Sequence, residues 1–532
     1  MSFRENSNQQ ITLSDSLWGL TPREKKALEK SWARTFSEEI MPLIDEKRFS
    51  VLYSEKASRP NTPVNVIIGA LIIKELFDYS DDEMVENLML DLHLQYALNT
   101  TSFKEQPLSD KTLSNFMKRC YDYETLHNVD LYHECVKDLG GKLKKLMGIN
   151  GRIRRMDSMM IKSNIRKLSR IELLYACISR PATVINKQDA SVLPEELKHY
   201  ADPNDFNQVM YHNRSTESDG RLRVILTDAD KFLKLCEGEY EDLQAYELLV
   251  RCLCEQTIVE EGNRRLREKE DGGMDSRIMQ NPSDPDATFR TKAGKEYRGY
   301  TANLEESVGE GGSVITDYQF DVNTRSDSSF LKENLEAQER SEEPVTMVTD
   351  SAYYSDDNVE LAKDKNITLL TTNLTGVATP DIYADFEFSE DGKTVLKCPA
   401  GHAPKTCCYR NSNEKCYISF PADVCKACPH RNECSPHFHK QTASLNISRK
   451  GRNRARCQRE MKGDKFSALC RLRNGVETVP LNLRKNFHID KLPRGKQRGK
   501  FFFGSKIAAL NFRKLFNYRT GSIKCAQNPI FA

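Results

Sequence analysis

The chain has no run of eighteen apolar residues, so no segment is expected to cross a membrane as a helix. Its first residues also lack the apolar core of a secretory signal peptide. Net charge is nearly absent, because 79 Lys and Arg face 77 Asp and Glu, for a formal value of +2. A soluble, cytoplasmic protein is therefore expected, with its 16 cysteines as reduced thiols or metal ligands rather than disulfides.

The near-zero net charge hides an uneven distribution. From Lys440 to Lys524 there are 23 Lys and Arg but only four acidic residues, so this segment has a net charge of +19. The rest of the chain must then carry −17, because the whole chain is +2. A basic block of this size suggests a polyanionic partner. The alternative is a lysine-rich surface that contacts only water.

No Ser or Tyr arranged as a nucleophile stands out, but an aspartate follows the clearest predicted strand. Val345–Thr349 holds five β-favouring residues and ends directly before Asp350. A capped helix start is predicted at Ser355. A carboxylate at the carboxyl end of a buried strand lies where α/β sheets usually open their active sites. The alternative is that Asp350 only caps the turn.

Two further carboxylates make this strand end a candidate metal site. Asp157 lies within a second β-like run, residues 152–161, and Glu477 is one of the few acids of the basic C-terminal region. Mg²⁺ prefers oxygen ligands, and three carboxylates can hold two ions about 3.5–4 Å apart. Asp157, Asp350 and Glu477 therefore have the residue types that a two-metal phosphodiester site needs.

These residues and their flanks resemble a known family. Met156–Ile161 is similar to the first-aspartate motif of bacterial insertion-sequence transposases of the Asp-Asp-Glu (DDE) type. Gln280–Thr288, followed by Lys292–Tyr300, resembles the stretch that these enzymes carry before their second core strand. A cysteine cluster before the glutamate fits one branch of the family, and the resemblance covers roughly residues 40 to 520.

The resemblance implies a DNA transposase with Asp157, Asp350 and Glu477 as its catalytic triad and Mg²⁺ or Mn²⁺ as its cofactor. Double-stranded DNA, as element ends and target, is the implied partner, with no membrane partner and with a homo-oligomer assembled on the DNA. Cleavage of the phosphodiester would be followed by attack of the freed 3′-hydroxyl on target DNA. Two alternatives stay open, a metal-dependent nuclease of the same fold without strand transfer and a non-catalytic DNA-binding relic.

The family signature around the glutamate is Tyr-x₂-Arg-x₃-Glu-x₆-Lys. In this chain Arg473 and Glu477 match it, Cys470 replaces the tyrosine, and Arg484 replaces the lysine. An arginine still suits a phosphate, whereas a cysteine supplies no aromatic contact. Pro480 is expected to end or kink the helix that carries Glu477. The predicted DNA-binding or phosphate-binding residues are Arg473, Arg484, Lys496 and Arg498, with Lys491, Arg494 and Lys500 on the same basic track.

Seven cysteines lie between Cys398 and Cys434. Cys425 and Cys428 form a CxxC knuckle, and with Cys398 and Cys434 they could complete a tetrahedral zinc site. The family branch often has cysteine at these four positions, which favours them over Cys407, Cys408 and Cys416. Other candidate ligands are His402, His430, His437 and His439. The alternative is a set of reduced structural thiols, and a redox role is not favoured because no thioredoxin-like pattern surrounds the knuckle.

The fold class expected is α/β, an RNase H-like mixed sheet flanked by helices. Strands are predicted at 296–304, 313–322, 345–349 and 367–371, with a helix at about 328–339. The expected divisions are a loose leader at 1–20, an all-helical domain for DNA ends at 21–150, a catalytic core at 151–380 with a helical insertion at 191–271, a Cys-rich zinc-ribbon-like insertion at 381–440, and a basic part of the core at 441–532. A purely structural helical bundle is the alternative for 21–150.

A last amphipathic helix is expected within Lys500–Tyr518. Its apolar face would pack on the sheet, with Lys506, Arg513 and Lys514 pointing outward. In the N-terminal part, Thr21 is a predicted helix cap, Ser80–Glu83 a capping box, and 64–73 a core helix.

Overall fold

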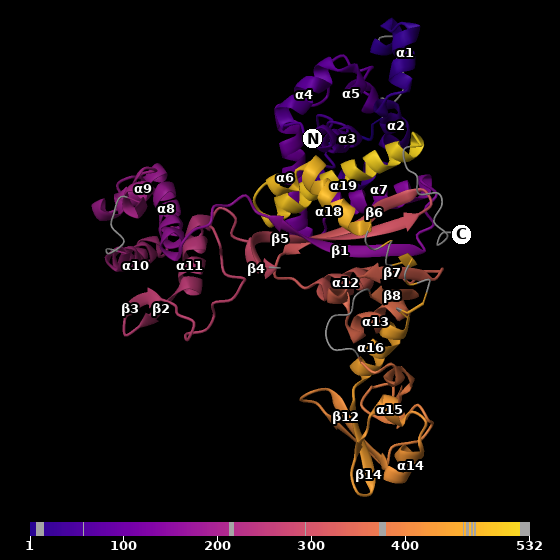
Figure 1. Ribbon diagram of the computed structural model, residues 1–532. Helices are drawn as coiled ribbons and strands as arrows, with labels where there is room; N and C mark the ends of the chain where they lie inside the picture. The colour runs from indigo at the N-terminus through magenta and orange to yellow at the C-terminus, as the bar shows by residue number, and fades with distance from the viewer. Residues whose placement is uncertain are drawn as a thin grey trace.

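The structure is a computed structural model in which a mixed sheet lies at the centre of the chain (Figure 1). No described helix is long and apolar enough to span a bilayer. The residues described are 1–6, 15–56, 58–211, 218–292, 294–371, 379–460, 462–463, 466, 468–469, 472 and 475–521.

The central sheet has the strand order β6-β5-β1-β7-β8, with β4 paired to the first residues of β5. β6, β5 and β1 are antiparallel, whereas β1, β7 and β8 are parallel. Helix α12 connects β6 to β7, and α13 connects β7 to β8. This order of three antiparallel and two parallel strands confirms the RNase H-like arrangement expected from the sequence. The elements are β1 (Ile153–Lys162), β4 (Thr288–Lys292), β5 (Lys295–Gly309), β6 (Gly312–Val322), α12 (Asp327–Ala337), β7 (Val345–Thr349), α13 (Asp356–Asp364) and β8 (Ile367–Thr371).

The strand bounds follow from local sequence. β7 and β8 begin and end where the β-favouring runs do, because charged or turn-forming residues flank each run. β5 is longer than expected and buried along its second half, since β1 and β6 cover its two edges. The caps expected at Thr21 and Ser80 are both present as capping boxes.

Helices occupy the N-terminal part of the chain, but they do not form a separate core. One hydrophobic cluster joins residues of α3 and α7 to β5, β6 and the C-terminal helix α19, which runs between the N-terminal helices and the sheet (Figure 1). The core therefore does not divide near residue 150, where a domain boundary was expected. The helices are α1 (Pro22–Glu29), α2 (Trp32–Glu39), α3 (Val64–Phe77), α4 (Asp81–Leu90), α5 (Leu92–Ala97), α6 (Asp110–His127), α7 (Leu131–Leu146), α18 (Thr478–Phe487) and α19 (Lys496–Arg519), with 3-10 turns at Ser16–Gly19, Met41–Leu43 and Lys47–Leu52.

The position of α19 corrects the expectation that its lysines point outward. Lys506 is 6% exposed and pairs with Glu75 of α3, and Lys514 pairs with Glu306 of β5. Arg513 lies over the ring of Phe487. The helix is covered on both sides, so its charged residues must find partners inside the protein.

Two adjacent glycines of α7 differ in what surrounds them, which gives a matched test of this packing. A Cβ on Gly140 would lie 2.6 Å from the backbone oxygen of Ile315 in β6, whereas nothing lies within 4 Å of a Cβ on Gly141. We expect Gly140→Ala to lower the free energy of unfolding by about 1–3 kcal/mol through overpacking. Gly141→Ala should raise it by about 0.5–1 kcal/mol, because alanine favours the helix. Urea titration of both variants would measure the difference, and equal stabilities would contradict the close contact of α7 with β6.

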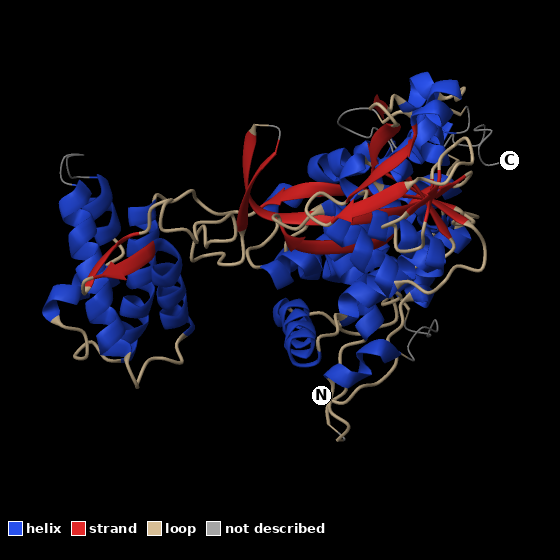
Figure 2. Ribbon diagram, turned by 90° about the horizontal axis from the view of Figure 1, so that it is seen from below, coloured by secondary structure: helices blue, strands red, loops and turns tan. Residues whose placement is uncertain are grey.

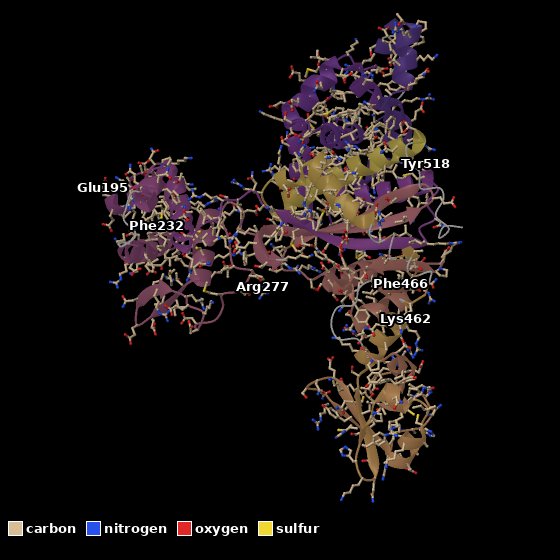
Figure 3. All side chains as sticks on the ribbon, in the orientation of Figure 1. Glu195, Phe232, Arg277, Lys462, Phe466 and Tyr518 are labelled. Atoms are coloured by element: carbon tan, nitrogen blue, oxygen red, sulfur yellow. The ribbon has the colours of Figure 1, made fainter. Side chains whose placement is uncertain are left out.

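The helical insertion stands beside the sheet and is joined to it by extended loops (Figure 2). It has its own hydrophobic core, which runs from Leu173 to Met279 and therefore includes α8. The insertion thus begins earlier than residue 191, because periodicity alone cannot tell which core a helix joins. Figure 3 labels the fully buried Phe232 and the exposed Glu195 in this unit. Its elements are α8 (Arg170–Gln188), α9 (Asp205–Tyr211), α10 (Ser218–Cys236), α11 (Gln244–Gln256) and an unexpected hairpin of β2 (Thr257–Glu260) and β3 (Asn263–Leu266).

The Cys-rich unit also has a core of its own and extends to Ile447, beyond the expected limit at residue 440. Its main sheet has the order β11-β12-β14-β13. Helix α16 (Arg449–Glu460) follows it and lies between this unit and the central sheet (Figure 1). Arg459 of α16 forms ion pairs with Asp381 and Asp385. The other elements are β9 (Glu387–Phe388), β10 (Val395–Lys397), β11 (Thr406–Arg410), β12 (Lys415–Pro421), α14 (Ala422–Ala427), α15 (Arg431–Cys434), β13 (His437–Phe438) and β14 (Thr442–Ile447).

Candidate active site

The two predicted aspartates lie at the same level of the central sheet. β1 and β7 are parallel, and their register pairs Arg155 with Val348. Asp157 and Asp350 each lie two residues further along their strands, so the register places them beside each other on one face. Both side chains are partly exposed. Two carboxylates, one within β1 and one directly after β7, therefore lie side by side within reach of solvent.

A buried tyrosine lies near both aspartates. Tyr353 is fully buried in the short turn after Asp350, and its hydroxyl donates to Asn303 Oδ1 of β5 at 2.6 Å. Burial raises its pKa well above the usual value, and the negative charges of Asp327, Asp157 and Asp350 raise it further. One ring thus lies close to both candidate ligands. The sequence alone assigns no role to Tyr353, because Asn303 becomes its partner only in the folded chain.

The aspartate side chains also shape their own backbone. Asp350 Oδ1 accepts from the amide of Ala352 at 2.8 Å. Asp350 therefore does cap the turn, which was the alternative role considered for it. Asp157 Oδ1 accepts from the amide of Ser158 at 3.0 Å. Capping and metal binding are compatible, because a carboxylate has several lone pairs and one amide uses a single one.

Glu477 lies on a segment that is tied to β1 on both sides. It ends the short 3-10 turn η8 (Gly475–Glu477), which packs against β1. Before it, the carbonyl of Leu472 accepts from Arg155 Nη1 at 2.5 Å, and after it, Arg484 Nη2 donates to the carbonyl of Met160 at 3.0 Å. Arg155 and Met160 bracket Asp157 on the strand. The two ties therefore hold the segment with Glu477 across the part of β1 that holds Asp157.

The local structure around Glu477 differs from expectation. Glu477 is the N-cap of α18, so the helix begins after the glutamate and Pro480 lies in its first turn. Pro480 does not end this helix, because a first-turn residue needs no amide hydrogen for the helical hydrogen bonds. Cys470 and Arg473 lie outside the described residues, so the role of Arg473 at the phosphate stays a prediction.

Much of the basic C-terminal charge is neutralised within the protein. Lys496 pairs with Asp321 at 2.6 Å, and Lys500 pairs with Asp130 at 2.7 Å. These pairs join the basic segment to acidic residues elsewhere in the chain. Part of its positive charge is therefore balanced by the negative charge of the remaining chain. Lys496 and Lys500 are thus engaged in ion pairs. Arg494 and Arg498 are exposed, and Arg494 Nε donates to the carbonyl of Asn164 at 2.7 Å. Arg484 is committed in part to β1.

Four cysteines of the Cys-rich unit come together. Cys398, Cys425, Cys428 and Cys434 line one small cavity of about 40 Å³, which His430 also borders. Burial, together with the charges of the other three sulfurs, raises the pKa of the Cys434 thiol to about 12. The alternatives lie elsewhere, since Cys416 donates to the carbonyl of Lys393 and Cys408 is exposed.

The side chains at the two sites are not in ligand geometry as they stand. In the part of the chain that the structure describes, no group of three or more His, Cys, Asp or Glu side chains is arranged to hold a metal ion. The chemistry of the donors still suits the expected ions, with carboxylate oxygens at the sheet and thiols in the cavity. The metal ligands therefore stay predictions.

Two family models match the chain. The model described as Transposase domain (DUF772) matches residues 26–119, from α1 into α6. The model described as Transposase DDE domain matches residues 397–516, which include the four clustered cysteines, Glu477 and most of α19.

Other comparisons add little. No curated protein matches the chain. A solved structure described as "Cryo-EM structure of piggyBac transposase synaptic complex with hairpin DNA" is similar at 8% identity and a TM-score of 0.29, over 94% of this chain and 75% of that chain. This similarity is too weak to indicate a shared fold or function. The two matched models show that the chain carries a transposase domain and a transposase DDE domain, which supports a DNA transposase function.

Proposed function

We propose that this transposase cuts DNA at the ends of an insertion sequence and joins the freed 3′-hydroxyl to target DNA, with Asp157, Asp350 and Glu477 as its catalytic residues. The observation that carries the proposal is the β1 geometry. The parallel register sets Asp157 beside Asp350, and ties at Arg155 and Met160 hold the Glu477 segment across the same stretch of strand.

Mg²⁺ or Mn²⁺ is the proposed cofactor of this site. Two such ions, when bound, would stabilise the entering and leaving oxygens of an in-line displacement. The three residues would contribute hard oxygen ligands, and their partial or full exposure leaves room for a DNA backbone. Tyr353, fixed by its hydrogen bond to Asn303, would hold the Asp350 turn in place while the DNA is cut and joined.

Assays of cleavage and strand transfer would test this function. A DNA fragment bearing the element's ends should be cut in the presence of Mg²⁺, and the cut end should join a second DNA. Cutting without joining would identify a nuclease of the same fold. Binding without cutting, under Mg²⁺ and Mn²⁺ alike, would identify a non-catalytic relic. Because an element has two ends and the site forms within one chain, we expect two or more copies to act together on DNA.

A structural zinc ion is proposed for the cavity lined by Cys398, Cys425, Cys428 and Cys434. The four sulfurs border one small space in a unit with a separate core. Small units of this kind commonly need a metal or another covalent constraint for stability, because their hydrophobic core is limited.

The exposed Arg494, just before α19, and Arg498, in its first turn, should contribute most to sequence-independent DNA binding. We expect the double variant Arg494→Ala with Arg498→Ala to flatten the dependence of log affinity on log salt by about one to two units, because each arginine would neutralise a phosphate. Lys496→Ala is the matched control, since Lys496 already pairs with Asp321. Fluorescence anisotropy on several sequences at several salt concentrations would measure both. An equal loss of slope in the Lys496 variant would show that this lysine leaves Asp321 to bind DNA.

A further inference from the structure

A buried charge network connects β1 to the segment that carries Glu477. Glu306 of β5 is completely buried, and its carboxylate accepts from Arg155 Nε at 2.6 Å. Lys514 of α19 pairs with the other carboxylate oxygen of Glu306 and also donates to Ser313 Oγ at 3.0 Å. The network therefore joins three strands, β1, β5 and β6, to the last helix.

The carboxylate of Glu306 is charged at neutral pH. Burial raises the pKa of Glu306, but the charges of Lys514 and Arg155 outweigh that effect and lower it to about 2. A carboxylate with this pKa stays ionised, so it keeps its hold on the guanidinium of Arg155. Arg155 is only 7% exposed, so its guanidinium cannot easily turn to solvent.

The guanidinium of Arg155 makes a second interaction besides its ion pair with Glu306. While Nε and Nη2 bind Glu306, Nη1 donates to the carbonyl of Leu472, five residues before Glu477. A Cβ on Gly475 would lie only 2.5 Å from the same Nη1, so the backbone of η8 approaches the guanidinium as closely as a glycine allows. Arg155 lies two residues before Asp157 on β1, and alternation along the strand puts both on one face.

We propose that Arg155, fixed by Glu306 and Lys514, is a positioning residue that sets the distance of Glu477 from Asp157. The inference rests on the proposed function, because it assumes that Glu477 is a ligand of the catalytic metals. A guanidinium suits this task, since its planar fork can bind a carboxylate on one edge and a carbonyl on another. A lysine could pair with Glu306 but could not reach both partners.

Arg155→Lys is the test, because it keeps a positive charge beside the buried Glu306 and removes the bond to Leu472. We expect its single-turnover cleavage rate to fall about 10- to 100-fold, as is usual when a residue that orients a metal ligand is lost. The Mg²⁺ concentration at half-maximal rate should rise, while DNA affinity changes little. A purely structural role would not move the Mg²⁺ dependence.

Arg154→Lys is the matched control. Arg154 is the preceding residue on β1, points to the opposite face, and binds Glu305 and Gln338 instead. Its variant should lose comparable side-chain contacts without changing the Mg²⁺ dependence. Gly475→Ala is a second test if Arg155→Lys folds poorly, because the added methyl crowds Nη1 from the other side and should give the same rise in Mg²⁺ demand.

Three outcomes distinguish a failure of the positioning role of Arg155 from a failure of the proposed catalytic role of Glu477. If Glu477→Gln abolishes cleavage and Arg155→Lys or Gly475→Ala raises the Mg²⁺ demand above that of Arg154→Lys, the positioning role is supported. If Glu477→Gln abolishes cleavage but the Arg155 and Gly475 variants match the control, the positioning role is wrong and the proposed function stands. If Glu477→Gln cuts at the normal rate, the glutamate assignment and the positioning role both fail.

Discussion

Replacing Asp157 or Asp350 with Asn, or Glu477 with Gln, should abolish DNA cleavage while leaving folding and DNA binding nearly intact. Each substitution keeps the shape of the side chain but removes the negative charge that would hold a divalent ion. The loss should be at least about 10²- to 10³-fold in rate, the usual cost of removing one group that stabilises developing charge. Single-turnover cleavage with Mg²⁺, alongside a binding assay and thermal unfolding, would measure it.

Asp357→Asn is a suitable control for these variants. Asp357 is exposed in the first turn of α13, seven residues after Asp350, so it is an acidic neighbour outside the proposed site. Its variant should cleave at close to the normal rate. Near-normal cleavage by any one of the three site variants would remove that residue from the triad. Loss of DNA binding together with cleavage would instead indicate a role in holding the DNA.

The second large effect is expected at the Cys-rich unit. Cys428→Ser or Cys434→Ser should remove a bound zinc ion and unfold the segment from about residue 381 to 447, because apparent zinc binding to a structural site contributes about 10–16 kcal/mol in small zinc-binding peptides. Elemental analysis of the purified protein would measure zinc, and limited proteolysis would locate the unfolded segment. The central sheet should stay folded, since its core is a separate cluster.

Cys408→Ser provides the comparison within the same unit. Cys408 is exposed on β11 and does not line the cavity, so its variant should keep zinc and resist proteolysis as the parent does. Purified protein without zinc would contradict the metal proposal and favour reduced structural thiols. Loss of zinc in the Cys408 variant would show that the ligand set has been assigned to the wrong cysteines.

Local sequence determined the strands and many helix starts. Val345–Thr349 and Ile367–Thr371 match their predicted bounds because short runs of β-favouring residues are flanked by residues that stop them. Thr21 and Ser80 begin helices because each side chain satisfies an amide that the first turn leaves unpaired. The order of these elements agrees with the RNase H-like sheet that the family resemblance implied, and the places of Asp157 and Asp350 on predicted strands made them candidate ligands.

The tertiary structure alone decided which distant charges meet. Lys506 lies in a helix whose lysines were expected to face solvent. Instead it is buried in an ion pair with Glu75, which lies more than four hundred residues earlier in the chain. Periodicity describes one helix and cannot show that a second layer covers its polar face. The same limit hid the pairing of Glu306 with Arg155 and Lys514, and with it the tie to the Glu477 segment. Residue types are local properties, whereas burial, and therefore the need of a charge for a partner, arises only when the layers assemble.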